Sequence, residues 1–367
     1  MGLEELVRGP VRGLKPYVPG KPIEEVQREL GLEHVVKLAS NENPLGASPR
    51  ALEAVVVALS CAGRYPENSA YALRQALAGR LDVSPDSLTF GNGSSEVITM
   101  VCDAFLSQGE EAVIAEDTFV VYRLAATIAG ASQRLVPLKD MTYDLDAMCA
   151  AVGPKTKVVF LCSPNNPTGT ANASRELARF MERVPERVLV VLDQAYVEYC
   201  DPEYDFDPLP YVRDGRRLVV LRTFSKVYGL AGLRVGYGIS TPQIADYLNR
   251  VRPPFNVSCL AQVAAVAALN DGRHVKRSRE ANRAGRDFLY KEFDRLRVSY
   301  TPTQANFITF DCGDGGPEIC QHLLEAGVVV RPLVSFGMAP RYLRVTIGTQ
   351  EENEVFISAL GRILGGG

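Results

Sequence analysis

The chain has 367 residues, of which 46% are hydrophobic and 23% are charged. This length is enough for one large domain and a smaller one, and the composition is typical of a compact globular protein. A formal net charge of −3 offers no general attraction to nucleic acid or to an anionic membrane, so we expect neither as a partner.

The chain shows no pattern of a targeting or membrane segment. The N-terminus, MGLEELVRGP, carries charges and lacks the apolar core of a secretory signal. No apolar run approaches the roughly 18 residues needed to span a bilayer. The eight cysteines do not form C-x₂-C pairs, so we interpret them as reduced thiols and expect no metal site. These features together predict a soluble, cytoplasmic protein.

Residues 1–47 are predicted to form an N-terminal arm and a segment of the smaller domain. Prolines interrupt the stretch RGPVRGLKPYVPGKP, so it cannot form one helix. Ser48 followed by Pro49 is typical of a helix start, with serine as the N-cap and proline in the first turn. We therefore place the start of the large domain, residues 48–270, at this point.

The large domain is predicted to hold a mainly parallel β-sheet with helices on both faces. From about residue 85, short β-branched apolar runs alternate with helical stretches, which is typical of a doubly wound α/β fold. The predicted strands are SLTFG, EAVIAE, TKVVFLCS, RVLVVLDQ, RLVVLRTFS and RVGYGIS.

A long, charged helical stretch over about residues 255–297 is predicted to lead into a small C-terminal α+β domain, residues 271–367. Its mixed charges are typical of a solvated helix face. The runs NFITFD, VVVRPL and YLRVTIG indicate strands, and PEICQHLLEAG indicates a helix between the first two. Thr349 and Glu352 form a capping box, which predicts that a final helix begins there.

Polar residues lie where the predicted strands end, and open α/β sheets place their sites at these ends. In FGNGSSEV, residues 90–97, the glycines allow close approach of a ligand, and Ser94, Ser95 and free N–H groups could hold an anion. The same stretch could also be an ordinary capped helix start. In CSPNNPTGT, residues 162–170, the prolines make a rigid turn that fixes the amide side chains of Asn165 and Asn166.

Two further strand ends carry charges in apolar surroundings. Asp193 ends the run VVLD, and Tyr196 follows three residues later. A carboxylate there is costly unless it is paired or hydrogen-bonded, although it could simply cap a helix. Lys226, in TFSKVYGLAGLRVGYG, could be a buried ion-pair partner or an amine whose pKa is lowered by burial, and Arg234 lies eight residues further on.

One cofactor, pyridoxal 5′-phosphate, needs all four of these features. It needs a lysine amine to bond its aldehyde, a carboxylate for its pyridine nitrogen, donors for its ring oxygen, and an anion seat for its phosphate. A nucleotide-binding protein could use the glycine loop alone, but it would leave Lys226, Asp193 and Tyr196 unexplained.

At these residues the chain resembles the fold-type I pyridoxal-phosphate aminotransferases, over about residues 35–355. The resemblance implies that Lys226 holds the cofactor covalently and that Asp193 pairs with its pyridinium nitrogen. It assigns the ring oxygen to Asn166 and Tyr196, and ring stacking to Phe119, where many relatives have tyrosine. The residues implied to surround the cofactor phosphate are Ser94, Ser95, Thr223, Ser225 and Arg234.

A narrower resemblance, to the histidinol-phosphate aminotransferases, lies at the two ends of the chain. It rests on GLKPYVPGKPIEEVQRELGL, KLASNENPLGASP, RYPENSAYALR, and GVVVRPL followed by YLRVTIGT. The family pattern implies that Tyr17 and Asn43 approach the substrate. It also implies that Tyr65 reaches the cofactor phosphate of a neighbouring subunit, in a homodimer with shared active sites.

The same resemblance implies a substrate role for Arg331 and Arg344, which lie thirteen residues apart on strands expected to be adjacent. Guanidinium groups suit both the α-carboxylate of glutamate and the phosphate of histidinol phosphate. The implied activity is amino transfer from glutamate to imidazole-acetol phosphate in histidine biosynthesis. An aromatic amino-acid aminotransferase or a threonine-phosphate decarboxylase would keep the same cofactor residues, so both stay as alternatives.

Overall fold

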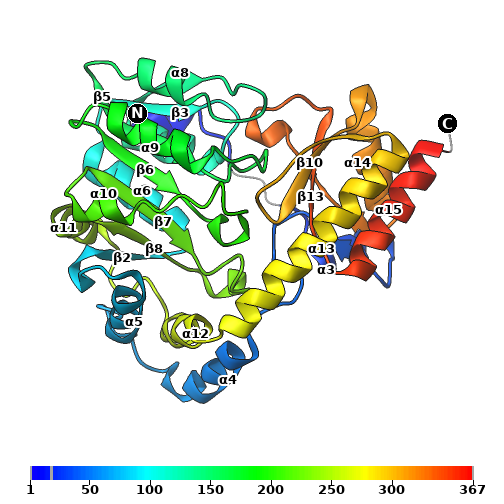
Figure 1. Ribbon diagram of the computed structural model, residues 1–367, viewed down its shortest axis with the longest axis horizontal. Coiled ribbons are helices and arrows are strands. Elements are labelled where there is room, and N and C mark those ends of the chain that lie inside the picture. Colours follow the sequence, from blue (N-terminus) through cyan, green and yellow to red (C-terminus); the bar gives the residue numbers. More distant parts are fainter. Residues whose placement is uncertain (1, 17–19, 366–367) are drawn as a thin grey trace.

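In the computed structural model, which describes residues 2–16 and 20–365, a seven-stranded sheet forms the centre of the larger part of the molecule (Figure 1). From edge to edge its strands are β2 (Leu88–Asn92), β8 (Val235–Ser240), β7 (Leu218–Thr223), β6 (Leu189–Asp193), β5 (Thr156–Cys162), β3 (Glu111–Ala115) and β4 (Ser132–Val136). Strands β7, β6, β5, β3 and β4 run parallel, which confirms the prediction of a mainly parallel sheet.

Two strands of this sheet differ from the prediction. Strand β8 is antiparallel to both β2 and β7. Residues 224–234 connect β7 to β8, and their only helix is the short turn Ala231–Leu233. A parallel pair would need a longer crossover connection, usually a helix, to bring the chain back to the other end of the sheet. Strand β4 was not predicted, because it lies at the edge of the sheet and only its last residue is buried.

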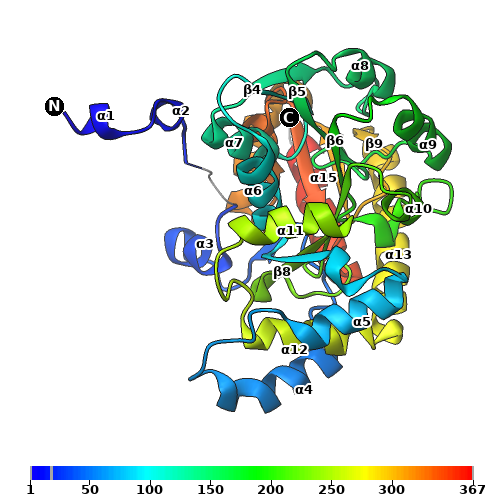
Figure 2. The same cartoon turned by 90° about the vertical axis from the view of Figure 1, so that its left-hand side faces the viewer.

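Helices cover both faces of the sheet. In Figure 2, α6 and α7 lie on one side of β5 and β6, and α9 and α10 lie on the other. The helices of this part are α4 (Pro49–Ala58), α5 (Tyr71–Leu81), α6 (Ser94–Phe105), α7 (Val120–Ala129), α8 (Leu145–Ala150), α9 (Ser174–Arg183), α10 (Leu209–Arg213), α11 (Pro242–Val251) and α12 (Cys259–Leu269). As predicted, α4 begins after Ser48, whose side chain accepts a hydrogen bond from the Ala51 N–H.

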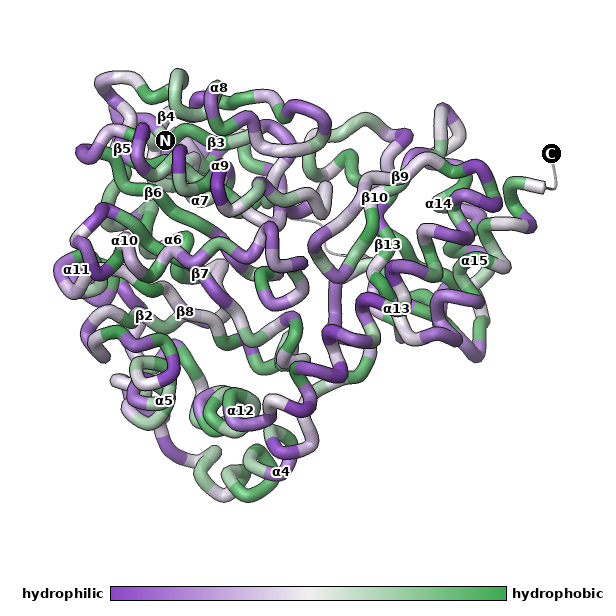
Figure 3. Tube along the Cα trace, in the orientation of Figure 1, coloured by the Kyte–Doolittle hydropathy of each residue, from purple (hydrophilic) through white to green (hydrophobic). Residues whose placement is uncertain are grey.

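The large core forms because the inner strands are apolar on both faces. Every residue of β6 is buried. Its neighbour β5 has one exposed residue, and its neighbour β7 has one half-buried residue. Figure 3 shows these strands as a hydrophobic band beneath more polar helices. This packing fixes the carboxyl ends of the strands, where the polar residues of the candidate site begin.

The smaller part holds a four-stranded antiparallel sheet in the order β12 (Arg331–Pro332), β13 (Tyr342–Thr346), β10 (Phe307–Asp311) and β9 (Ser299–Thr301). Its helices are α13 (Gly272–Leu296), α14 (Gly316–Glu325) and α15 (Gln350–Gly365). Helix α15 has the predicted capping box, since Thr349 and Glu352 exchange hydrogen bonds between side chain and backbone. The core of this part packs Phe293 and Leu289 of α13 against the sheet.

The structure corrects two details of this region. The run VVVRPL does not form one strand: β11 (Val328–Val329) pairs with β1 (Val36–Lys37), whereas β12 pairs with β13. The predicted helical stretch over 255–297 is two helices, α12 and α13. They separate at Asp271, whose side chain accepts a hydrogen bond from the His274 N–H and so caps α13.

The N-terminal residues contain three short helices, α1 (Leu3–Leu6), α2 (Gly9–Arg12) and α3 (Ile23–Leu30). Figure 2 shows α1 projecting from the main body, whereas α2 contacts α7, and the Arg8 guanidinium beside α2 donates to the Ile128 backbone oxygen at 2.7 Å. Among the helices in the described ranges, none is both long and apolar enough to cross a membrane. The predicted bounds of the domains, 1–47, 48–270 and 271–367, stay predictions.

Candidate active site

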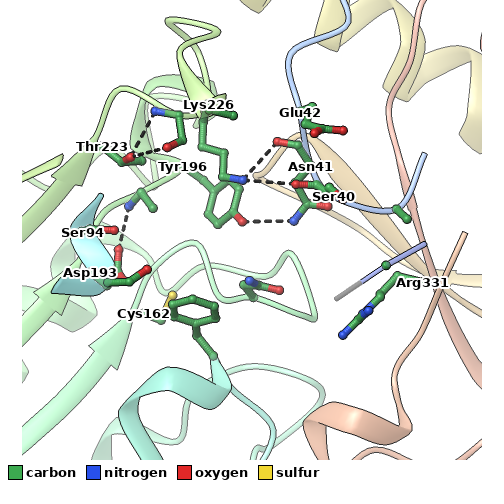
Figure 4. A pocket seen from close by; sticks show the side chains of 18 of the residues that line it. Ser40, Asn41, Glu42, Ser94, Cys162, Asp193, Tyr196, Thr223, Lys226 and Arg331 are labelled. Carbon is green, nitrogen blue, oxygen red and sulfur yellow. Dashed lines mark hydrogen bonds between the residues drawn. The ribbon is translucent and has the colours of Figure 1, made fainter. Parts of the chain in front are cut away.

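A cavity of about 380 Å³ lies where the carboxyl ends of the parallel strands face the small sheet (Figure 4). The large part lines it with strand ends and with the start of α6, and the N-terminal segment lines it with residues 39–42. The small part adds two arginines from its sheet. The residues that carry chemistry here are Ser94, Ser95, Asn166, Asp193, Tyr196, Thr223, Ser225, Lys226, Arg234, Arg331 and Arg344.

Lys226 reaches across the cavity from the loop that follows β7. Figure 4 shows its amine pointing to the N-terminal segment, where it donates to the backbone oxygens of Asn41 at 3.2 Å and Ser40 at 3.4 Å. Burial, and then the nearby Arg344 guanidinium, lower the pKa of Lys226 to about 7. A large fraction of this amine is therefore uncharged at neutral pH, which a nucleophile requires.

Asp193 is the last residue of β6 and is 2% exposed. The Tyr122 hydroxyl donates to its Oδ2 at 2.7 Å, and the Ala195 N–H donates to its Oδ1 at 3.0 Å. Burial raises the pKa of Asp193 to about 6, although both hydrogen bonds favour the ionised form. A buried carboxylate of this kind gains from a cation placed beside it, such as a protonated ring nitrogen.

The start of α6 and the loop after β7 form one anion seat. Ser94 and Ser95 lie in the first turn of α6, where N–H groups have no partner within the helix. Arg234 donates to the Ser225 hydroxyl oxygen at 3.3 Å, and the Thr223 hydroxyl donates to the same oxygen at 3.0 Å. A cation, several hydroxyl groups and a helix N-terminus are thus gathered at one end of the cavity.

Tyr196 and Asn166 lie between this seat and the small sheet. The Asn41 side-chain amide donates to the Tyr196 hydroxyl oxygen at 3.0 Å (Figure 4). The Asn166 side-chain oxygen accepts a hydrogen bond from the Arg344 guanidinium. Asn165 does not line the cavity; its amide donates to the Thr168 hydroxyl at 2.9 Å and holds the turn.

These groups fit pyridoxal 5′-phosphate. The uncharged amine of Lys226 suits its aldehyde, the buried carboxylate of Asp193 suits its ring nitrogen, and the anion seat suits its phosphate. Tyr196 lies between them and can bond the ring oxygen. Phe119, the predicted stacking residue, also lines the cavity.

Comparison with known proteins agrees with this fit. Residues 33–360 match the family described as aminotransferase class I and II. The chain belongs to this family. It is 51% identical to the histidinol-phosphate aminotransferase of Moorella thermoacetica, over 97% of this chain and 92% of that protein.

Two other similar proteins lead to the same group of aminotransferases. The chain is 46% identical to histidinol-phosphate aminotransferase 1 of Nitrosococcus oceani, over 98% of this chain and 97% of that protein. The crystal structure of histidinol-phosphate aminotransferase from Sinorhizobium meliloti, in complex with pyridoxal-5′-phosphate, superposes with a TM-score of 0.90 at 27% identity, covering 98% of each chain.

In this class I and II aminotransferase, Arg331 and Arg344 lie side by side. Their Cα positions pair directly between β12 and β13, which confirms that the two strands are adjacent. Both side chains are buried, at 5% and 4% exposed. Arg344 also donates to the Ala39 backbone oxygen at 3.0 Å and lies 4.9 Å from the Phe307 ring centroid. The pair adds a second cationic region to the cavity, opposite the seat at α6.

The structure places Asn43 outside the cavity wall. Its side-chain amide donates to the Val227 backbone oxygen and to the Ser278 hydroxyl oxygen, both at 2.9 Å, and so joins the N-terminal segment to α13. Asn41, two residues earlier in the same SNENP stretch, lines the cavity instead. The sequence alone does not indicate which of the two asparagines lines the cavity, because this depends on the path of the backbone.

One predicted aromatic residue, Tyr65, does not line this cavity as the single chain forms it. Tyr65 is 83% exposed and stacks on Phe255, with the ring centroids 4.8 Å apart. Tyr17 lies outside the described residues.

Sequence reasoning also missed Tyr122, the residue bonded to Asp193. It lies in FVVYRLAATIA, where a tyrosine among apolar residues is indistinguishable from a core residue of the helix. No local signal reveals that its hydroxyl meets a carboxylate 71 residues further along the chain.

Proposed function

We propose that this chain is a histidinol-phosphate aminotransferase that uses pyridoxal 5′-phosphate in histidine biosynthesis. The observation that carries the proposal is one cavity in which Lys226, with a pKa of about 7, lies between the buried Asp193 and the paired arginines of the small sheet. The likeness to histidinol-phosphate aminotransferases over nearly the whole chain supports the same activity.

Residues at the sheet ends would hold the cofactor. Lys226 would bond its aldehyde, and Asp193 would pair with its ring nitrogen. Tyr196 and Asn166 would hydrogen-bond its ring oxygen, and Phe119 would pack against its ring. The residues that would bind its phosphate are Ser94, Ser95, Thr223, Ser225 and Arg234, which all line the cavity.

When bound, pyridoxal 5′-phosphate supplies a carbon that carries the amino group and a ring that accepts the electron pair released at the substrate Cα. Lys226, whose pKa is lowered by burial to about 7, would act as the base that takes the proton from the substrate Cα and as the acid that later gives a proton back. Asp193 keeps the ring nitrogen protonated and so stabilises the charge that develops.

The paired arginines bind the anionic ends of both substrates. Arg344 takes the α-carboxylate of glutamate, and Arg331 and Arg344 together take the phosphate of the other substrate. Planar guanidinium groups bind both anions through two parallel hydrogen bonds, so one site can accept each in turn. In the biosynthetic direction glutamate donates the amino group and imidazole-acetol phosphate accepts it. Asn41, which lines the cavity, takes the place in this scheme that the sequence had assigned to Asn43.

Amino transfer is tested with the purified protein loaded with pyridoxal 5′-phosphate. We expect histidinol phosphate and 2-oxoglutarate to give glutamate in equal amount to the histidinol phosphate consumed. Borohydride should attach the cofactor to Lys226, and Lys226→Ala should lose both the attachment and at least about 10³-fold in turnover. Normal turnover by Lys226→Ala, or carbon dioxide release from threonine phosphate in place of amino transfer, would contradict the proposal.

We also propose that the protein is a cytoplasmic homodimer with shared active sites. A surface around α4 exposes Leu52, Val56, Val57 and Leu59, with Val57 81% exposed, and Tyr65 follows on the same stretch of chain. Apolar patches of this kind mark interaction surfaces in water-soluble proteins. In such a dimer, Tyr65 reaches the cofactor phosphate of the second subunit.

A further inference from the structure

Tyr122 is a fully buried phenol bonded directly to Asp193. It lies in the first turn of α7, is 0% exposed, and donates its hydroxyl to Asp193 Oδ2 at 2.7 Å. Its ring stacks on Phe160 with the centroids 5.0 Å apart and meets Phe119 edge-on at 5.6 Å. Packing on both sides therefore fixes the direction of the hydroxyl group.

This phenol remains a donor under all ordinary conditions. Burial, and then the charge of Asp193, raise the pKa of Tyr122 well above its usual value, so the hydroxyl keeps its proton. The second carboxylate oxygen, Oδ1, accepts from the Ala195 N–H at 3.0 Å. With one donor on each oxygen, the carboxylate of Asp193 cannot rotate without losing a hydrogen bond in a buried place.

We propose that Tyr122 is a positioning residue for the cofactor: its hydroxyl fixes the Asp193 carboxylate and keeps it ionised, ready for the protonated ring nitrogen. The residue that caps the same turn of α7 is Phe119, which lines the cavity. One helix start thus sets both a wall of the cofactor site and the orientation of its essential carboxylate. The inference rests on the cofactor named in the proposed function and does not depend on the substrate.

The test measures the dissociation constant of pyridoxal 5′-phosphate from the apoprotein, which requires no substrate. Tyr122→Phe removes one oxygen atom and keeps the stacked ring. We expect it to weaken cofactor binding about tenfold, the typical effect of a lost hydrogen bond to a charged group. Tyr143→Phe is the matched control: Tyr143 is also buried, but its hydroxyl bonds Thr118 at 2.7 Å. It should change the constant by less than about twofold.

The same substitution in the Asp193→Asn background separates positioning from general packing. If the phenol acts through the carboxylate, Tyr122→Phe should add less than about twofold to the loss already caused by Asp193→Asn. An equal loss in both backgrounds would overturn the proposal, and so would an unchanged constant in Tyr122→Phe or a matching loss in Tyr143→Phe.

The folding of the variants is informative as well. If Tyr122→Phe alone does not fold, the variant that combines Tyr122→Phe with Asp193→Asn decides. A folded double variant supports the proposal that the phenol stabilises the charged carboxylate. An unfolded double variant overturns this proposal. A failure of histidinol phosphate as substrate would leave all of these cofactor measurements standing, so the two proposals can fail separately.

Discussion

At the scale of single residues, the proposed mechanism depends on an uncharged Lys226 amine at neutral pH. Burial lowers its pKa first, and the Arg344 guanidinium adds to the effect, bringing the value to about 7. Because Arg344 is placed by β13, the small part adds to the lowering of the pKa of a lysine in the large part.

This arrangement predicts a pH dependence for cofactor capture by the apoprotein. The rate should rise with pH until it levels above about pH 7, since the uncharged amine reacts and its protonated form does not. Arg344→Gln removes a like charge and should move the midpoint up by roughly one unit, so capture at pH 7 becomes slower. The measurement is the rate of forming the borohydride-stable adduct between about pH 5 and pH 10.

Arg331→Gln is the control for this prediction, because Arg331 is equally buried and pairs with Arg344 across the two strands. Its midpoint should stay near that of the unsubstituted protein, about pH 7. A midpoint near the ordinary lysine value of about 10.4 in the unsubstituted protein would refute the account of Lys226.

The sequence identifies a functional residue when burying that residue type costs much free energy. Asp193, Lys226 and Arg344 stand out because a charge within an apolar run is costly without a function or a partner. Tyr122 and Asn41 do not stand out, since a tyrosine in a helix and an asparagine in a loop are ordinary there. Their roles come from contacts across 71 and 155 residues of chain, to Asp193 and Tyr196 respectively.

At the scale of elements, the anion seat depends on how closely β8 approaches the start of α6. A Cβ at Gly236 in β8 would lie 2.3 Å from the Ser94 backbone nitrogen and 2.6 Å from the Gly93 carbonyl carbon. Both neighbours are backbone, so neither can turn away. Gly236 therefore sets the position of the N–H groups at the start of α6, which are proposed to bind the cofactor phosphate.

Gly236→Ala should push the start of α6 away from the seat. We expect a loss of about 1–3 kcal/mol in the free energy of unfolding and weaker binding of pyridoxal 5′-phosphate. Gly79→Ala is the contrast, because Gly79 lies in α5, where an added Cβ would meet no neighbouring atom within 4 Å. That change should stabilise the protein by about 0.5–1 kcal/mol and leave binding unaltered. Calorimetry and cofactor titration check both; unaltered binding by Gly236→Ala would disprove the role of the close approach.

The predicted elements were right where burial is two-sided and less accurate elsewhere. The continuous apolar runs of β5, β6 and β7 identify inner strands of a parallel sheet without ambiguity. The direction of β8 was missed because an apolar run carries no sign of direction. Edge strands such as β4 and β9 have few buried residues, so they lack the apolar run that identifies a strand.

At the scale of the whole molecule, the site is assembled from three parts of the chain. The large sheet supplies the residues proposed to hold the cofactor, the N-terminal segment contacts Lys226, and the small sheet supplies the arginine pair. The sequence indicated polar strand ends in the large part and an arginine pair in the small part, but not the contact of the N-terminal segment with Lys226, because contacts between segments far apart in the chain leave no local pattern.

The proposed dimer adds a fourth part, Tyr65 of the second subunit. The purified protein should have twice the mass of the 40.0 kDa chain in light scattering. Val57→Lys, on the exposed apolar surface of α4, should shift it toward the monomer, whereas Leu364→Lys, 40% exposed at the far end of α15, should not.

If the two subunits share their active sites, two inactive variants should restore activity when they form a mixed dimer. Lys226→Ala and Tyr65→Ala should each be weak or inactive alone, yet a co-expressed mixed dimer should regain one intact site. A mixed dimer with no more activity than its parents would show that Tyr65 does not serve the neighbouring subunit.

The central claim, that this aminotransferase acts on histidinol phosphate, is tested most directly by kcat/KM for competing amino donors. Histidinol phosphate, phenylalanine and threonine phosphate are compared side by side with 2-oxoglutarate as acceptor. The buried arginine pair should favour histidinol phosphate over phenylalanine by at least about 10²-fold, since guanidinium groups bind a phosphate through charge-assisted hydrogen bonds that an uncharged ring cannot make. A kcat/KM for phenylalanine or threonine phosphate equal to or above that for histidinol phosphate would contradict the claim.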